Sequence, residues 1–82
     1  MNNKSEELKK QADVLKGVRE STGLNRTEFS EYMGIPLRSL EEWEAGRRKM
    51  PDYLLRLITY YVGVSRFLQE KGIDPEEIDN NP

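Results

Sequence analysis

The chain has 82 residues, of which 35% are hydrophobic and 34% are charged, so it supports at most one small domain with a modest core. It contains no cysteine and no histidine, which excludes disulfides and thiol catalysis and removes the usual metal ligand and the usual general base at neutral pH. No apolar run approaches the roughly 18 residues of a membrane span, so we expect a soluble, cytoplasmic protein that is not an enzyme and holds neither a metal nor a cofactor.

The first part of the chain predicts two helices joined by a glycine turn. Ser5 is a good N-cap, and apolar residues then recur at spacings of three and four, which indicates an amphipathic helix over residues 5–21. Gly23 suits the left-handed conformation that is common just past a helix end. Asn25 can cap a second helix over residues 26–33. The apolar positions of the two helices are Leu8, Ala12, Leu15, Val18, Phe29, Tyr32 and Met33.

A third helix is predicted over residues 36–45. Gly34 permits a tight reversal before it, Pro36 suits its first turn because proline lacks the N–H that would be unpaired there, and Gly46 ends it. At roughly 100° per residue its two sides differ in character. The inward side holds Leu40, Trp43 and Glu44, and the outward side holds Leu37, Arg38, Glu41, Glu42 and Ala45. Because a short glycine-containing turn joins it to the second helix, the pair has the form of a helix-turn-helix.

The fourth predicted helix is the longest and runs from Asp52, as its N-cap, to about Lys71. The segment contains no proline, so we predict one long helix; the alternative is a bend at Gly63. The inward positions are predicted to be Leu54, Leu57, Ile58, Tyr61, Phe67 and Leu68. No stretch alternates at period two for long enough to indicate a strand, so the chain is predicted to be all-α.

Charge divides the chain into a body and a tail. The formal net charge is −2, but residues 70–82 carry five acidic groups against one lysine, which leaves a balance of +2 for residues 1–69. We expect one domain over residues 1–71 and an acidic, disordered tail over residues 72–82. Asp74 followed by Pro75 also has the form of a helix start, after which at most one turn fits.

Residues 15–51, LKGVRESTGLNRTEFSEYMGIPLRSLEEWEAGRRKMP, resemble the phage repressor and Cro type (xenobiotic-response-element-like) of helix-turn-helix DNA-binding domain. The matching positions are Arg19, Gly23-Leu24, Phe29-Ser30, Gly34-Ile35, Leu40, Trp43, Glu44 and Gly46. The resemblance implies a compact four- to five-helix bundle of the lambda-repressor-like kind. It implies a small transcriptional regulator that binds double-stranded DNA sequence-specifically, as a repressor acting as a homodimer on an inverted repeat. It also implies an internal ion pair between Arg19 and Glu44.

The outward side of the third helix is the expected base-contacting surface. Arg38 can donate two hydrogen bonds to a guanine, and a carboxylate of Glu41 or Glu42 can accept one from a cytosine. Leu37 suits the methyl group of a thymine. Carboxylates repel a polyanion, so the alternative is that both glutamates point past the groove and pair with Arg38 or Arg47 as ordinary helix neighbours.

Cations beside the third helix are the expected phosphate contacts, which fix the register of a protein on the duplex. The run Arg47-Arg48-Lys49 follows that helix directly. Arg26 stands where the family usually has a glutamine that bonds a phosphate, and its longer charged side chain can replace it. The alternative for the three-cation run is a solvated loop that balances Glu42 and Glu44 or favours the C-terminal end of the helix.

The fourth helix carries more apolar side chains than a core of three short helices needs, so we expect a partner surface on it, most simply for a second copy of the chain. The expected dimer-interface residues are Tyr53, Tyr60, Val64 and Phe67. Two other interpretations stay open. An antitoxin would use the same core and bind a toxin through its tail or fourth helix, and a protein-interaction module would keep the scaffold and have lost DNA binding.

Overall fold

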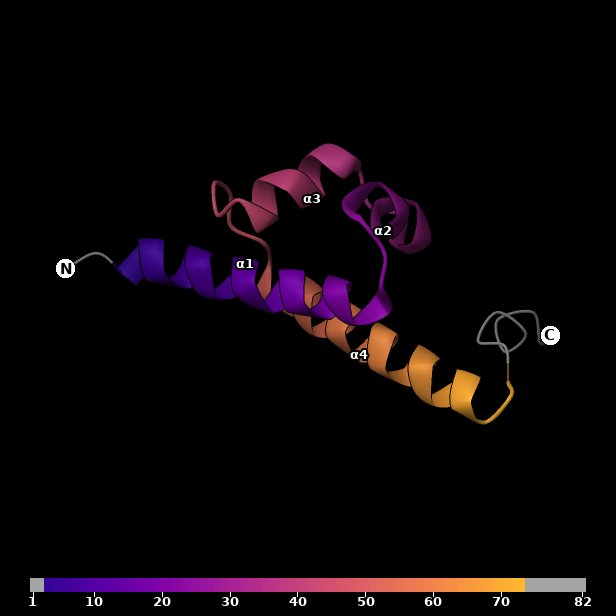
Figure 1. Cartoon of the computed structure of the whole chain (residues 1–82). Helices are drawn as coiled ribbons and strands as arrows, with labels where there is room; N and C mark the ends of the chain where they lie inside the picture. The colour runs from indigo at the N-terminus through magenta and orange to yellow at the C-terminus, as the bar shows by residue number, and fades with distance from the viewer. Residues whose placement is uncertain (1–2, 74–82) are drawn as a thin grey trace.

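The computed structural model describes residues 3–73, in which four helices and no strand are present. In chain order the helices are α1 (Asn3–Thr22), α2 (Arg26–Met33), α3 (Leu37–Glu44) and α4 (Asp52–Glu70) (Figure 1). The prediction of an all-α chain is confirmed for these residues. None of the four described helices is long and apolar enough to cross a membrane. Residues 74–82 of the predicted tail, with the helix start at Asp74, lie outside the described residues.

Local signals in the sequence explain both ends of α2. The side chain of Asn25 accepts a hydrogen bond from the backbone N–H of Glu28 at 2.8 Å, and the carboxylate of Glu28 accepts one from the backbone N–H of Asn25 at 2.9 Å. This capping box satisfies two donors near the helix start, so the predicted cap at Asn25 is confirmed. At the other end Gly34 has a φ of 72°, a left-handed conformation that glycine adopts without steric cost.

Three helix starts differ from the prediction by one or two residues. α1 begins at Asn3. Pro36 and Pro51 both occupy N-cap positions, so neither α3 nor α4 has a side-chain cap. The predicted capping role of Asp52 is therefore wrong: Asp52 is the first residue of α4, and its carboxylate accepts a hydrogen bond from Nε2 of Gln11 at 2.8 Å. A proline fits the N-cap position because it has a fixed φ and no N–H to satisfy.

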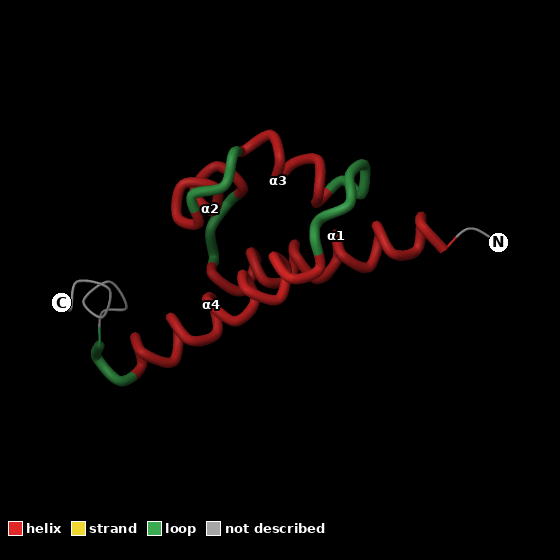
Figure 2. Tube along the Cα trace, turned by 180° about the vertical axis from the view of Figure 1, so that it is seen from behind, coloured by secondary structure: helices red, strands yellow, loops and turns green. Residues whose placement is uncertain are grey.

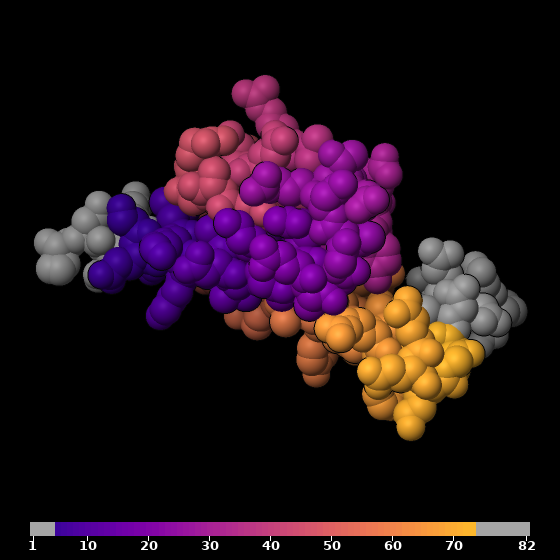
Figure 3. All heavy atoms as spheres, in the orientation of Figure 1, coloured from indigo at the N-terminus to yellow at the C-terminus, as the bar shows by residue number. Residues whose placement is uncertain are grey.

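α1 is the helix on which the others assemble, because it packs against both α3 and α4, while α2 packs against α3. Figures 1 and 2, which view the molecule from opposite sides, both show α2 and α3 on one side of α1. In both views α4 projects past the end of α1 with its C-terminal half. The space-filling view shows α3 and the connector after it as one surface of the molecule, on the side away from α4 (Figure 3).

The core takes at least one large side chain from each helix and one from the connector between α3 and α4. Its buried residues are Leu15, Phe29, Leu40, Trp43, Met50, Ile58 and Val62. Burying each of these side chains contributes about 1.5–3 kcal/mol to folding before the loss of conformational entropy is counted. Trp43 belongs to this core, as the side of α3 that it shares with Leu40 predicts.

The side of α4 that faces the core differs only in part from the prediction, because Leu54 and Leu68 are half-buried and Leu54 packs against the core. The residues predicted to point inward that are exposed are Leu57, Tyr61 and Phe67. Buried instead are Ile58, Val62 and Ser65, which follow one another at spacings of four and three. Of these only Ile58 was predicted. α4 runs through Gly63 without a break, which confirms the prediction of one long helix.

Candidate nucleic-acid interface

A tight turn connects α2 to α3. The backbone N–H of Ile35 donates to the carbonyl oxygen of Ser30 at 2.9 Å, and that of Gly34 donates to the carbonyl oxygen of Glu31 at 3.3 Å. Ser30 is buried, and its hydroxyl group donates to the carbonyl oxygen of Thr27 at 2.8 Å. A small side chain that satisfies its own polar group locally therefore occupies this buried position of α2.

The two sides of α3 differ as its sequence predicts. Leu40, Trp43 and Glu44 are buried, whereas Arg38 and Glu41 are exposed. The two remaining predicted base-contacting residues are less open, because Leu37 and Glu42 are both half-buried. The outward side of α3 therefore presents one exposed cation, Arg38, and one exposed anion, Glu41. A half-buried leucine and a half-buried glutamate lie beside them.

Glu44 is the centre of an ion-pair cluster that connects α1 to the end of α3. Its side chain is 0% exposed, and its oxygens accept hydrogen bonds from Arg19 at 2.8 Å (Nε) and 3.1 Å (Nη2). The third guanidinium nitrogen of Arg19 donates to the carbonyl oxygen of Leu24 at 3.0 Å. Arg19 is itself only 11% exposed. The ion pair that the family resemblance implies is thus present, in the two-pronged geometry that matches a guanidinium to a carboxylate.

Arg26 joins the same cluster. Its Nε donates to Oε1 of Glu44 at 2.9 Å. A carboxylate has about four acceptor sites, so Glu44 can hold both arginines. Arg26, which was expected to contact a phosphate, makes an internal ion pair in this structure, and 47% of its side chain remains exposed.

The two arginines determine the ionisation of Glu44. Burial raises the pKa of its carboxyl group, but hydrogen bonds from Arg19 and Arg26 and their positive charges outweigh burial and hold the pKa below its ordinary value of 4.5. The hydrogen bond to Glu44 likewise raises the pKa of Arg19 above its ordinary value. Glu44 and Arg19 are therefore both charged at neutral pH.

Each cation of the run after α3 has its own contact. Arg47 pairs with Glu42 at 3.1 Å, and its hydrogen bond lowers the pKa of that carboxyl group. The Glu42–Arg47 pair is the alternative that the sequence left open for that glutamate. Lys49 pairs with Glu7 of α1 at 3.7 Å. Both pairs lie at the surface, although Glu42 is half-buried, so solvent screens them and they hold their cations weakly.

Arg48 is held against α3 itself. Its Nη2 donates to the hydroxyl group of Ser39 at 3.1 Å, and its guanidinium carbon lies 5.8 Å from the ring centroid of Trp43. This distance permits a cation–π interaction. The indole N–H of Trp43 is buried and has no hydrogen-bond partner among residues 3–73.

Gln11 of α1 fixes the end of the same connector. Its side-chain oxygen accepts a hydrogen bond from the backbone N–H of Met50 at 3.0 Å, and its side-chain nitrogen donates to the carbonyl oxygen of Met50 at 2.7 Å. The same nitrogen donates to Asp52. The connector is therefore tied to α1 directly before α4 begins.

Arg38 differs from every other cation near α3. Within residues 3–73 its guanidinium group makes no hydrogen bond or ion pair, and it projects from the first turn of α3. Glu41, one turn further along, is also exposed and makes no ion pair within the described part of the chain. Among the described residues, these two side chains are available to a ligand without the loss of a side-chain hydrogen bond or ion pair.

The expected dimer-interface residues are all exposed and all lie on α4. They are Tyr53, Tyr60, Val64 and Phe67. The exposed side of α3 belongs to a different surface, because α4 lies on the far side of α1 in Figures 1 and 2. The structure therefore separates the two groups of predicted site residues.

Two supporting residues were missed by sequence reasoning. Glu28 has a signal that reveals it, because Asn-x-x-Glu before a helix is the pattern of a capping box. Gln11 has no such signal, since its partners Met50 and Asp52 are distant in the sequence.

No protein-family model matches this chain, and neither a curated protein nor a solved structure matches it. Among residues 3–73 no group of three or more acidic side chains is placed to hold a metal ion.

Proposed function

We propose that this protein is a small transcriptional regulator of the phage repressor and Cro type that binds double-stranded DNA sequence-specifically. In this proposal α2 and α3 form a helix-turn-helix, and α3 lies in the major groove as the recognition helix. The observation that carries the proposal is Arg38, an exposed arginine on the outward side of α3 that makes no hydrogen bond or ion pair with any other residue in 3–73. An arginine in this position is suited to the O6 and N7 atoms of guanine, the commonest specific contact of recognition helices.

The dimensions of α3 support this proposal. A major groove about 12 Å wide admits an α-helix with its side chains. Eight residues form α3, which corresponds to roughly two turns, and recognition helices contact bases with their first residues. Arg38 and Leu37 belong to that first turn, and Glu41 follows one turn later, where it is suited to accept from a cytosine amino group.

The cations after α3 support the proposal as phosphate contacts. Arg48 is already positioned by Ser39 and Trp43, so little side-chain freedom remains to be lost when it binds. Arg47 and Lys49 make only exposed ion pairs, which a phosphate can replace at small cost. Arg26 is the weakest of the expected phosphate contacts, because it would have to leave the buried carboxylate of Glu44.

A second candidate function is an interaction module that has lost DNA binding. The observation that favours it is the exposed carboxylate of Glu41 on the same side of α3 as Arg38, because a carboxylate without a base amino group to meet repels the duplex. An antitoxin would combine DNA binding through α3 with a toxin partner on another surface.

Selection of bound sequences from a random duplex pool at moderate salt tests the proposal. Enrichment of a motif with guanine at a fixed position, in two inverted half-sites, is the expected result. Absence of any salt-dependent DNA binding would overturn it and favour the interaction module, since phosphate contacts always make such binding salt-dependent.

A further inference from the structure

The outward face of α4 carries a regular line of exposed apolar residues. They are Tyr53, Leu57, Tyr60, Val64 and Phe67, and we call this line the α4 seam. Each of these side chains is between 48% and 76% exposed. The buried residues of α4, Ile58, Val62 and Ser65, belong to another side of the helix. α4 is therefore apolar on two sides, and only one of them is used within the chain.

The spacing of the α4 seam indicates the shape of what covers it. Its residues follow one another at intervals of four, three, four and three, an average of 3.5. Apolar residues at that period form a nearly straight stripe along a helix. Such a stripe packs against a second helix by knobs-into-holes packing, in which each side chain fits between side chains of the other helix. A flat or irregular partner would not require this regularity.

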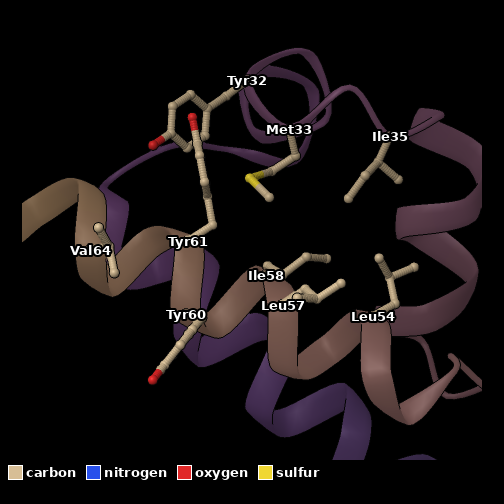
Figure 4. A pocket seen from close by; sticks show the side chains of 9 residues that line it. All are labelled: Tyr32, Met33, Ile35, Leu54, Leu57, Ile58, Tyr60, Tyr61 and Val64. Atoms are coloured by element: carbon tan, nitrogen blue, oxygen red, sulfur yellow. The ribbon is translucent and has the colours of Figure 1, made fainter. Parts of the chain in front are cut away.

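Two apolar hollows lie on either side of the seam. One has a volume of about 650 Å³ and is lined from α2, the turn after it and α4, with Met33, Ile35 and Leu54 among its residues (Figure 4). The other has a volume of about 600 Å³ and includes Val14 of α1. Leu57 and Tyr60 line both hollows. They therefore form a ridge between two hollows into which the side chains of a second helix can fit.

Tyr60 and Tyr61 point to different surroundings. Figure 4 shows Tyr61 directed toward Tyr32 of α2, whereas Tyr60 points away from both. The ring centroids of Tyr32 and Tyr61 are 5.8 Å apart, a packing distance for aromatic rings. Tyr61 therefore has an aromatic neighbour within the chain, and Tyr60 is the tyrosine that is directed outward.

The charges beside the seam identify the second helix as α4 of another copy, running in the opposite direction. Arg56 and Glu70 flank the seam on the same edge, and Gly63 lies midway, seven residues from each. When two identical helices pair antiparallel about a two-fold axis near Gly63, Arg56 of each copy faces Glu70 of the other. A parallel pair in register would place Arg56 opposite Tyr61, where no charge is present.

The same register also aligns the apolar residues. Tyr60 then lies opposite Val64 of the second copy, and Leu57 lies opposite Phe67, so four of the five residues of the seam meet one another. Gly63 has no side chain, so the two backbones can approach where they cross. Neither Arg56 nor Glu70 makes an ion pair with any residue in 3–73, so both are available for this contact.

We propose that two copies of this chain pair antiparallel through the α4 seam, with the two-fold axis near Gly63 and reciprocal Arg56–Glu70 ion pairs. α4 has 19 residues, so the contact extends over about 28 Å. This pairing specifies the homodimer that the family resemblance implies, and it rests on the proposed function only for its use on DNA, because pairing is measured with the protein alone.

Mixing two charge-reversed variants of the full chain tests the pairing. Arg56→Glu places Glu opposite Glu70, and Glu70→Arg places Arg opposite Arg56, so each variant alone should dimerise at least about tenfold more weakly than the parent. In an equimolar mixture every facing pair is again opposite in sign, so the heterodimer should recover parental affinity. Sedimentation equilibrium measures all three samples, and circular dichroism melts verify that each variant is folded.

Arg66→Glu is the matched control, since Arg66 is exposed on α4 but lies off the seam and makes no ion pair within the described residues. A mixture of Arg66→Glu and Glu70→Arg has the same difference in net charge between its two chains, but the new glutamate at position 66 does not face the new arginine at position 70. This mixture should therefore not recover dimerisation. A monomeric parent overturns the proposal, as does a mixture of Arg56→Glu and Glu70→Arg that stays monomeric or recovers no better than the control. A dimer that binds no DNA would leave this pairing intact and contradict only the proposed function.

Discussion

Arg19 and Glu44 form a two-pronged ion pair, 2.8 Å from Nε and 3.1 Å from Nη2, that connects α1 to the last residue of α3. The two residues are 25 positions apart in the sequence. Together with the buried Leu40 and Trp43, this pair holds α3 against α1.

Removing the carboxylate at the centre of this cluster should destabilise the fold strongly. Glu44→Ala leaves Arg19 nearly buried without its partner, which is expected to reduce the free energy of unfolding by about 3–5 kcal/mol. Glu42→Ala, the matched control, removes an exposed pair with Arg47 and should change stability little. Urea melts followed by the fluorescence of Trp43, the one tryptophan, measure both. Equal losses would show that Glu44 contributes no more than a surface charge.

The depressed pKa of Glu44 should make stability depend on pH in the acid range. In the unfolded chain Glu44 takes up a proton at about its ordinary pKa of 4.5, and in the folded chain it does so only at lower pH. The stabilisation is therefore complete above pH 4.5 and is lost as pH falls through the folded pKa.

Urea melts in buffers on both sides of pH 4.5 test this dependence. Glu44→Gln keeps the shape of the side chain but cannot ionise, so its free energy of unfolding should be lower at neutral pH and should fall less on acidification. A variant that loses stability in acid as steeply as the parent would assign the effect to other carboxyl groups.

Arg38→Ala should change which bases are preferred. Because Arg38 is exposed and makes no ion pair within residues 3–73, its removal should leave the melting temperature almost unchanged. On the selected site it should cost about 1–3 kcal/mol and relax preference at one base position. Arg66→Ala, on the projecting half of α4, is the control with the same loss of charge. Unaltered discrimination between the selected site and a scrambled duplex would contradict a base-reading role.

Arg48→Ala should act on all sequences alike. Arg48 lies beyond the end of α3 and contacts Ser39 and Trp43, so we expect it to meet a phosphate and not a base. Its loss should lower affinity for every duplex by a similar factor and reduce the slope of log affinity against log salt by about one unit. Binding titrations at several salt concentrations measure the slope. A slope equal to that of the parent would remove Arg48 from the phosphate contacts.

The short helices were predictable because their ends carry local signals. Asn25, Gly34 and Gly46 each act on the backbone within a few residues, so neighbouring sequence contains the necessary information. The side of α3 that is buried followed from helical geometry alone, since Leu40 and Trp43 share it and charged residues occupy the other side.

The face of α4 and the partner of Arg26 were not predictable in the same way. α4 is apolar both toward the core and along the α4 seam, so periodicity does not indicate which side is buried. Arg26 pairs with Glu44, which is 18 residues away. Such a contact depends on how α2 packs beside α3, which no local pattern encodes. The Arg19–Glu44 contact spans 25 positions, and it was expected only because of the family resemblance.

Gln11 of α1 fixes the backbone of the connector after α3, which the sequence of the connector does not indicate. Its amide group binds both the N–H and the carbonyl oxygen of Met50, as an adjacent strand would. Ordering a flexible residue costs about 1–2 kcal/mol of backbone entropy. Because folding has already fixed Met50 against α1, association with a duplex would not incur that loss again there. The affinity contributed by Arg47, Arg48 and Lys49 would then depend on an uncharged side chain that never meets the ligand.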